Sequence, residues 1–340
     1  MKWDFRYILG ALICTAMVAP GPPSMAQAKA NFWTPPKSTG QCGGSFSGIR
    51  SFKISKTVNR AKNPYDEGRL FAHYFGVGLS RTIKGQGVDQ FKTYILNAAR
   101  NMAFTKADFS GSSISPIYVQ SNILRLIAMY MVTLESKGSL TSDERKVLVA
   151  WGNALVSGQK SQRGNKSADS RAASGNALMS WGAVTGNNGL VNTGKRQALQ
   201  ALPYLLRNVG SLRRHSAHKS VSINALSLED EYNIALAHFI ESAAMLRNMG
   251  IDVYSTKTNG RTLHDAVDWW ADVIASRPKG FKGYSSKSHN FHVGWIPIYL
   301  HHFGNRPVAA KLRRIEKSVT GGRRPGFAAI SLGGATDCFW

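Results

Sequence analysis

The stretch QSNILRLIAMYMVTLESKGSLTSDERKVLVAWGNAL, residues 120–155, contains two helical patterns separated by one turn. Apolar residues recur every three or four positions on both sides of the segment SKG (136–138), which is typical of a helix end. Thr141 and Glu144 then have the spacing of a capping box at the start of the second helix. The stretch therefore predicts an antiparallel helix hairpin, with helices at 117–136 and 142–157.

The same helical periodicity continues on both sides of this hairpin, and the alternation expected of strands is almost absent. Ser227 with Asp230 and Thr262 with Asp265 repeat the capping spacing. The chain is therefore predicted to be all-α. Further helices are expected at 66–82, 88–104, 170–184, 194–208, 228–249, 262–275 and 306–318, with 293–303 as either a helix or a buried segment.

Short glycine-containing turns between these helices indicate antiparallel pairs, for which two arrangements are open. A solenoid would show a fixed sequence period, and none of the usual repeat signatures is present. A toroid of helix hairpins needs no such period, and the uneven lengths of the pairs favour it.

The first 28 residues have the pattern of a secretory signal peptide. Lys2 and Arg6 flank the beginning, residues 7–19 are apolar, and Ala26-Gln27-Ala28 gives a cleavage site after Ala28. We expect export to the periplasm or the medium and a single mature domain at 29–340, since no low-complexity linker divides it. No membrane insertion is expected, because the apolar run at 114–134 is interrupted by polar residues.

The net charge of +24 is the strongest compositional feature, and removing Lys2, Asp4 and Arg6 with the leader takes away +1 and leaves +23. Such a field attracts nucleic acid, anionic lipid or acidic polysaccharide. Export favours the polysaccharide over nucleic acid, although part of the charge also fits a generally basic surface. Cys42 and Cys338 remain after cleavage and form either one bridge or two free thiols.

Four stretches together resemble a known family. They are the hairpin at 120–155, GNALMSWGAV (175–184), EYNIALAHFIESAAMLRNMGIDVY (231–254) and GWIPIYLHHFGN (294–305). In this order they are similar to the alginate lyases, exported enzymes that cleave polymers of uronic acids. The resemblance implies an incomplete (α/α) toroid, a monomer, an acidic polysaccharide as partner, and no cofactor.

The resemblance also implies site residues. Asn176 and Trp181 match the first Asn and the Trp of an Asn-Asn-His-x-x-Trp motif, while Ala177 and Leu178 replace its second Asn and its His. Tyr232 matches the catalytic Tyr. Trp295 and Tyr299 match a late Trp-x-Glu-Pro-Tyr segment, in which Pro297 replaces the Glu. Ala225 stands at the position of the family's Arg.

Cleavage by β-elimination requires that the uronate carboxylate be neutralised, that a base remove the adjacent proton, and that an acid protonate the leaving oxygen. Tyr232 is expected to be the acid and also the base if nearby arginines lower its pKa. The run RRHSAHKS (213–220) offers the remaining groups. Arg214, with Asn176, would neutralise the carboxylate, Arg213 would bind substrate, and His215 or His218 would be the base if Tyr232 is not.

Aromatic and amide side chains suit sugar binding, because a pyranose face stacks on an aromatic ring. Trp181, Trp295 and Tyr299 are interpreted either as cleft walls or as packed core. His292 is a candidate sugar ligand, whereas His289-x-x-His292 lacks the further ligands of a metal site. Gln120 and Arg125 are expected to point from a helix end toward the cleft, with solvent as the alternative for Arg125.

The sequence thus favours an exported lyase of an alginate-like or glucuronan-like polymer. The alternatives are a non-catalytic protein that binds an anionic polysaccharide on the same fold, and a basic structural protein of the cell envelope.

Overall fold

The computed structural model describes residues 56–58, 67–107, 116–160, 168–207, 209–210, 225–275 and 293–320. Helices account for most of these residues. A short parallel pair of strands, β1 (Thr57–Val58) and β2 (Lys106–Ala107), joins the two segments that precede α4. The helices are α2 (Glu67–Ile83), α3 (Val88–Arg100), α4 (Pro116–Ser136), α5 (Ser142–Lys160), α6 (Ala168–Thr185), α7 (Asn188–Arg207), α8 (Ala225–Asn248), α9 (Leu263–Ala275), α10 (Trp295–Phe303) and α11 (Ala309–Thr320).

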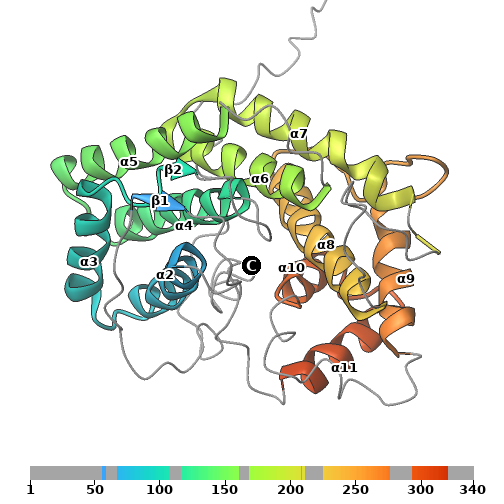
Figure 1. The fold of residues 1–340 in the computed structure, drawn as a ribbon. Coiled ribbons are helices and arrows are strands. Elements are labelled where there is room, and N and C mark those ends of the chain that lie inside the picture. The colour runs from blue at the N-terminus through green and yellow to red at the C-terminus, as the bar shows by residue number, and fades with distance from the viewer. Residues whose placement is uncertain are drawn as a thin grey trace, which may run out of the picture.

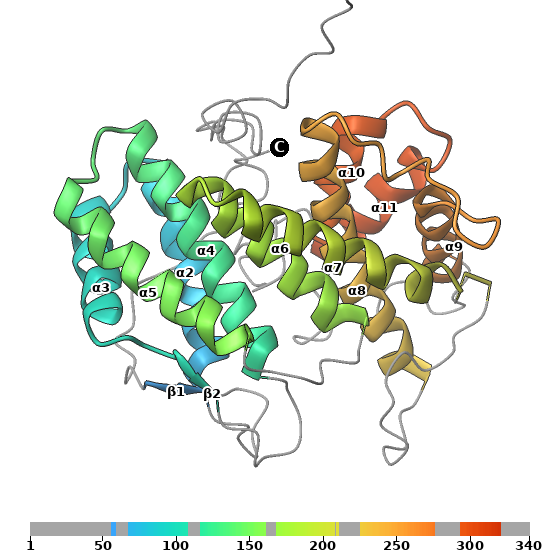
Figure 2. The ribbon, with the colours of Figure 1, turned by 90° about the horizontal axis from the view of Figure 1, so that it is seen from above.

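The helices form two layers that follow an arc (Figure 1). In the inner layer, α4 packs between α2 and α6, and α8 packs between α6 and α10. In the outer layer, α3 contacts α5, α7 contacts α9, and α9 contacts α11. Seen from above, α6 and α7 join the two ends of the molecule (Figure 2). The described helices leave the arc open between α2 and α11 (Figure 1), so the fold is all-α and an incomplete toroid, as predicted.

Two of the three predicted capping boxes are confirmed. The backbone N–H of Thr141 donates to Glu144 Oε2 at 2.9 Å, and the N–H of Glu144 donates to Thr141 Oγ1 at 3.2 Å. Thr262 and Asp265 make the same reciprocal pair before α9, at 2.7 and 3.2 Å. The third prediction is wrong, because α8 begins at Ala225 and Ser227 therefore lies inside the helix.

Two other helix boundaries differ from the prediction for local reasons. Helix α7 begins at Asn188, not at 194, because Asn187 Oδ1 accepts the N–H of Leu190 at 3.1 Å and so caps an additional turn. Helix α3 ends at Arg100, not at 104, because Met102 and Phe104 have φ angles of 50° and 57° in the left-handed region.

Helices α6 and α7 approach each other closely through small residues. A Cβ atom at Gly175 would lie 2.7 Å from the Gly194 carbonyl oxygen, and one at Gly182 would lie 2.7 Å from the Val191 backbone nitrogen. Both positions thus require glycine, and they fix the two helices as a tight antiparallel hairpin. The inner face of α6 then contacts α4 on one side and α8 on the other.

Helix α4 is the centre of the fold. It is the one helix in the described ranges that is long and apolar enough to cross a bilayer, but most of it is buried inside the protein, as in a core helix. One of its sides packs Tyr130 edge-on against Phe75 and Phe91, with ring centroids 5.5 and 5.4 Å apart. Other buried side chains on the helix are polar, and they form the site described below.

The predicted signal peptide, Cys42 and Cys338 lie outside the described residues.

Candidate active site between the inner helices

Buried polar side chains meet where α4, α6 and α8 face one another, and we call this group the inner polar cluster. Their helices are otherwise largely apolar, and all but one of these polar side chains are buried at the interface; Tyr118 is partly exposed. Burying such groups costs free energy unless they pair with one another. The cluster consists of Tyr118 and Arg125 on α4, Asn176 and Ser180 on α6, and His238 and Glu241 on α8.

An ion pair joins α4 to α8 within this cluster. Arg125 Nη1 donates to Glu241 Oε2, and the two side chains are 1% and 3% exposed. Burial raises the pKa of Glu241, and the charge of Arg125 and the Asn176 amide oppose that rise. Arg125 therefore neither points toward a cleft nor extends to solvent, and both interpretations from sequence are wrong.

Asn176 supports this ion pair from α6. Its side chain is fully buried, and its Oδ1 accepts a hydrogen bond of 3.3 Å from Ser180 Oγ, one turn further along the helix. Its amide also opposes the rise in the pKa of Glu241 that burial causes. Asn176 therefore lies beside the Arg125–Glu241 pair, and among the described residues its buried Nδ2 has no hydrogen-bond partner.

A tyrosine and a histidine form the second contact between α4 and α8. His238 Nε2 and Tyr118 Oη are 3.3 Å apart, and the rings meet edge to face with centroids 5.5 Å apart. His238 is buried, whereas Tyr118 is partly exposed. His238 precedes Glu241 by three residues, about 4.5 Å along the helix axis, so the two contacts are neighbours. Tyr118 is thus the partly exposed end of a buried polar cluster.

Tyr232 also lies on α8, near its start. Its side chain is 1% exposed, and its ring packs edge-on against Trp269 with the centroids 4.9 Å apart. Burial raises its pKa, and the positive charge of Arg261 opposes the rise only in part. The predicted lowering of the pKa of Tyr232 is therefore wrong, because desolvation outweighs the nearby arginine.

Trp181 and Trp295, which the sequence offered as cleft walls or as packed core, both lie in the packed core. Trp181 is fully buried against Gly152, and its Nε1 donates to Asn153 Oδ1 at 3.0 Å. Trp295 is 1% exposed, and its Nε1 donates to Asn233 Oδ1 at 2.8 Å. Each indole N–H has a protein partner, so these rings hold helices together.

Gln120 has a structural role as well. Its side chain is fully buried, and its Nε2 donates to the carbonyl oxygens of Phe104 and Thr105 at 2.9 and 3.2 Å. These bonds attach α4 to the segment after α3, where the left-handed residues leave backbone groups outside a helix. The prediction that Gln120 points toward a cleft is wrong.

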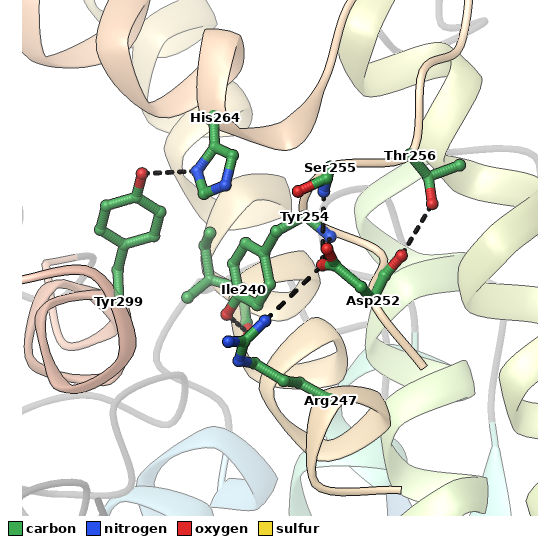
Figure 3. Close-up of polar contacts among 8 residues, drawn as sticks. All are labelled: Ile240, Arg247, Asp252, Tyr254, Ser255, Thr256, His264 and Tyr299. Atoms are coloured by element: carbon green, nitrogen blue, oxygen red, sulfur yellow. Dashed lines mark hydrogen bonds and ion pairs between the residues drawn. The ribbon is translucent and has the colours of Figure 1, made fainter. Parts of the chain in front are cut away.

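Tyr299 belongs to a second buried group, which we call the C-terminal aromatic cluster and which also contains Tyr254, His264, His302 and Phe303. Tyr299 is fully buried, and its Oη lies 2.7 Å from His264 Nδ1 (Figure 3). Tyr254 Oη donates to the carbonyl oxygen of Ile240 at 2.9 Å, which attaches the cluster to α8 (Figure 3). Burial lowers the pKa of His264 and lowers that of His302 to about 4, so both rings are neutral near neutral pH. Of the two interpretations of Tyr299, cleft wall and packed core, the structure supports the packed core.

The remaining predicted site residues lie outside the described residues. They are Arg213, Arg214, His215, His218 and His292. Their roles stay predictions.

Sequence reasoning missed Tyr118, His238 and Glu241. The signal was present in LAHFIES (236–242), where a histidine and a glutamate three residues apart interrupt an apolar helix. Polar residues at that spacing share one helix face and are expected to meet a partner. Arg125 interrupts the apolar pattern of α4 in the same way, and it carries the charge that pairs with Glu241.

Comparisons with known proteins agree with this architecture. The family model described as alginate lyase matches residues 85–281. Alginate lyase A1-III from Sphingomonas species A1 is similar in structure, with 16% identity, a TM-score of 0.55, and 85% of this chain and 88% of that chain covered. A histidine-to-alanine variant of alginate lyase A1-III, complexed with a tetrasaccharide, gives 16% identity, a TM-score of 0.60, and coverage of 89% and 86%. No curated protein matches the chain in sequence.

Proposed function

Because this chain belongs to the alginate lyase family, we propose that it is an exported polysaccharide lyase that cleaves an anionic polymer of uronic acids by β-elimination. The overall positive charge supports a polyanionic substrate, since it concentrates such chains at the protein surface. The observation that carries the proposal is the Tyr118–His238 contact, because it provides an acid–base pair on the inner helices although Leu178 stands at the family's histidine position.

In this proposal Tyr118 is the group that touches the substrate. The Tyr118 side chain is partly exposed, whereas His238, which contacts its hydroxyl, is buried. Transfer of the phenolic proton to His238 Nε2 leaves a phenolate that takes the proton beside the uronate carboxylate. As the electrons of that C–H bond form a carbon–carbon double bond, the glycosidic C–O bond breaks and Tyr118 gives the same proton to the leaving oxygen. His238 then returns the first proton to Tyr118, so one side chain acts first as base and then as acid.

The Arg125–Glu241 pair positions this acid–base pair. It holds α8 against α4 one turn from His238, and its groups are sealed from solvent. Neutralisation of the substrate carboxylate is assigned to Arg213 or Arg214, because Arg125 already has a carboxylate partner. Tyr232, with its raised pKa and its aromatic surroundings, is removed from the acid–base role in this proposal.

The loss of the Asn-His pair from the family's motif favours a second function, which is binding without cleavage. Ala177 is fully buried and Leu178 is 4% exposed, so neither position presents a polar group. A chain that had lost catalysis and retained the fold would bind an anionic polysaccharide without cleaving it.

Ultraviolet absorbance of the unsaturated product distinguishes the two functions. The purified chain is incubated with alginate, glucuronan or hyaluronan, and with neutral dextran as the control polymer. We expect product from at least one polyuronate and none from dextran. Saturable binding of a polyuronate without any product would favour the binding protein.

Two substitutions then test the assigned residues. Tyr118→Phe keeps the ring and removes the hydroxyl, and we expect a loss of about 10²- to 10⁴-fold in kcat with folding unchanged. His238→Gln removes the titrating ring behind it, and we expect a flattened pH–rate profile in addition to a lower kcat. Full activity of Tyr118→Phe together with inactivity of Tyr232→Phe would return the acid–base role to Tyr232.

A further inference from the structure

The C-terminal aromatic cluster contains a histidine–tyrosine pair whose burial is the reverse of that of the inner pair. On the inner helices, Tyr118 is partly exposed and His238 is buried. In the C-terminal cluster, His264 is half-buried and Tyr299 is fully buried, and the two groups are in contact (Figure 3). Water can therefore reach the histidine of this second pair, which is the member that titrates closer to neutral pH.

The burial of Tyr299 decides which atom of the pair carries the shared proton. Among the described residues, His264 Nδ1 is the one hydrogen-bond partner of the Tyr299 hydroxyl, at 2.7 Å. A buried O–H group without an acceptor would cost free energy, so Tyr299 donates and Nδ1 accepts. The neutral ring of His264 then carries its own proton on Nε2. The hydrogen bond between α9 and α10 thus requires an unprotonated Nδ1.

Protonation of His264 is incompatible with this hydrogen bond. Both nitrogens of an imidazolium ring are donors, so the Tyr299 oxygen would have to accept from Nδ1–H. The Tyr299 O–H would then have no acceptor in the described part of the chain. This cost exceeds the loss of one hydrogen bond, because a polar group stays buried without a partner. Opening the contact to water removes the cost.

The charged groups around His264 come from several elements. Burial lowers the pKa of His264, and Arg306 adds to that effect, whereas three carboxylates oppose it. Arg306 is held beside the cluster, because its Nη2 donates to Asp268 Oδ2 at 3.0 Å. His264 is therefore neutral near neutral pH and takes up a proton as the pH falls. The carboxylates are Asp268 and Asp265 on α9 and Asp252 between α8 and α9, and the adjoining rings also face Arg247 on α8 and His302 on α10.

Tyr254 connects this pair to α8. Its ring packs against those of His264 and Tyr299, with the centroids 5.7 and 6.0 Å apart. Its hydroxyl donates to the carbonyl oxygen of Ile240 at 2.9 Å (Figure 3). Ile240 directly precedes Glu241, so this bond reaches α8 in the turn that carries the inner polar cluster. A change in the packing of the pair therefore acts on that turn.

We propose that the His264–Tyr299 pair is a pH switch, in which protonation of His264 separates α10 from α9 and loosens α8 beside the inner polar cluster. The stability that the neutral pair contributes is present above pH 6.5. It is lost as the pH falls below that value, because the open form then binds a proton more readily than the closed form. A protein with this switch is rigid at neutral pH and reversibly loosened in acid.

Hydrogen exchange of backbone amides, followed by mass spectrometry at about pH 7 and about pH 5, tests the switch. Each rate is divided by the intrinsic rate at the same pH. His302 also titrates in acid, so the comparison is between His302→Gln and His302→Gln/His264→Asn. The asparagine keeps an acceptor near the position of Nδ1 and does not titrate.

We expect acid to lower the protection of α10 and of the middle of α8 about tenfold in His302→Gln, and less than about twofold in the double variant. Amides of α3 and α5, at the other end of the arc, should keep their protection. An equal fall in both proteins would show that His264 is not the sensor. An equal fall in all helices would show a general acid destabilisation. Either result would overturn the proposal.

Tyr299→Phe in the same His302→Gln background tests the hydroxyl. It keeps His264 and removes the group that protonation would leave unsatisfied, so we expect a smaller effect of acid than in His302→Gln alone. An undiminished effect would contradict the role of the hydroxyl. Each protein is compared with itself at two pH values, so a variant that is less stable at neutral pH remains informative. No substrate is present, so the outcome does not depend on lyase activity.

Discussion

The inner polar cluster and the C-terminal aromatic cluster both bury polar side chains against α8, and they do so by different chemistry. The inner cluster buries a complete ion pair, Arg125 with Glu241. The C-terminal cluster uses neutral rings, and burial lowers the pKa of its histidines so that they stay uncharged. A buried charge gives little net stability, whereas neutral hydrogen-bonded rings add to the core. We infer from this contrast that the inner cluster serves the proposed active site, whereas the C-terminal cluster serves the stability of the fold.

The largest expected effect comes from breaking the ion pair. Arg125→Met leaves Glu241 buried without its cation, and we expect a loss of about 3–5 kcal/mol in the free energy of unfolding. The double variant Arg125→Met/Glu241→Leu removes both charges and should recover most of that loss. Urea unfolding measures both. A double variant as unstable as the single one would show that the pair itself stabilises the fold.

The next largest effect is expected from acid, which should destabilise the C-terminal aromatic cluster by protonating His302. Burial and the charges of His301 and Arg247 lower the pKa of His302 from 6.5 to about 4. The unfolded chain then binds a proton at higher pH than the folded chain, so the stability that the neutral ring contributes is present above pH 6.5 and is lost as the pH falls toward 4. Relative to His302→Gln, we expect the parent chain to lose about 1–2 kcal/mol across this window, because the half-exposed ring is partly screened by solvent. Parallel pH dependence of the two proteins in urea unfolding would contradict the assignment.

A smaller effect is expected from the Tyr299 hydroxyl. Tyr299→Phe removes the 2.7 Å contact with His264 and leaves the ring packing in place, so we expect a loss of about 1 kcal/mol in the free energy of unfolding. Catalysis should not change, in contrast to Tyr118→Phe on the inner cluster. A large loss of kcat in Tyr299→Phe, with stability retained, would place the second cluster in the active site.

The smallest effect is expected at the helix caps. Because one cap of the same kind lies in each half of the chain, the two losses in stability can be compared directly. Thr141 caps α5 and Thr262 caps α9 by the same reciprocal contacts. Replacing either by Ala should lower the free energy of unfolding by about 0.5–1 kcal/mol. Thermal unfolding of the matched pair checks this, and a much larger loss at Thr262 would mean that the C-terminal half unfolds as a separate unit.

The fold was largely predictable because its information is local. Helix periodicity and the Thr141–Glu144 and Thr262–Asp265 caps depend on residues within one or two turns, and the structure has them where expected. The predictions failed where a boundary depended on one side chain or on backbone strain, as at Asn187 and Met102.

The site was less predictable because its contacts are distant in sequence. Nothing near Arg125 shows that Glu241 is its partner, and nothing near Trp181 shows that its N–H reaches Asn153. The family resemblance directed attention to Tyr232, whose surroundings raise the pKa of its hydroxyl. Whether an aromatic or charged side chain faces solvent or core depends on packing between hairpins, which a single sequence does not specify.

The Arg125–Glu241 pair also has a consequence for the order of folding, because 116 positions separate its two residues. The aromatic side of α4 can assemble with α2, α3 and α5 while α8 is still unstructured, but the charged side must wait until the chain has closed that long loop. We therefore expect backbone amides on the aromatic side to become protected first in pulse-labelled hydrogen exchange. Until α8 docks, the Arg125 guanidinium lacks Glu241 and keeps water on the surface of α4 where Tyr118 and His238 later meet.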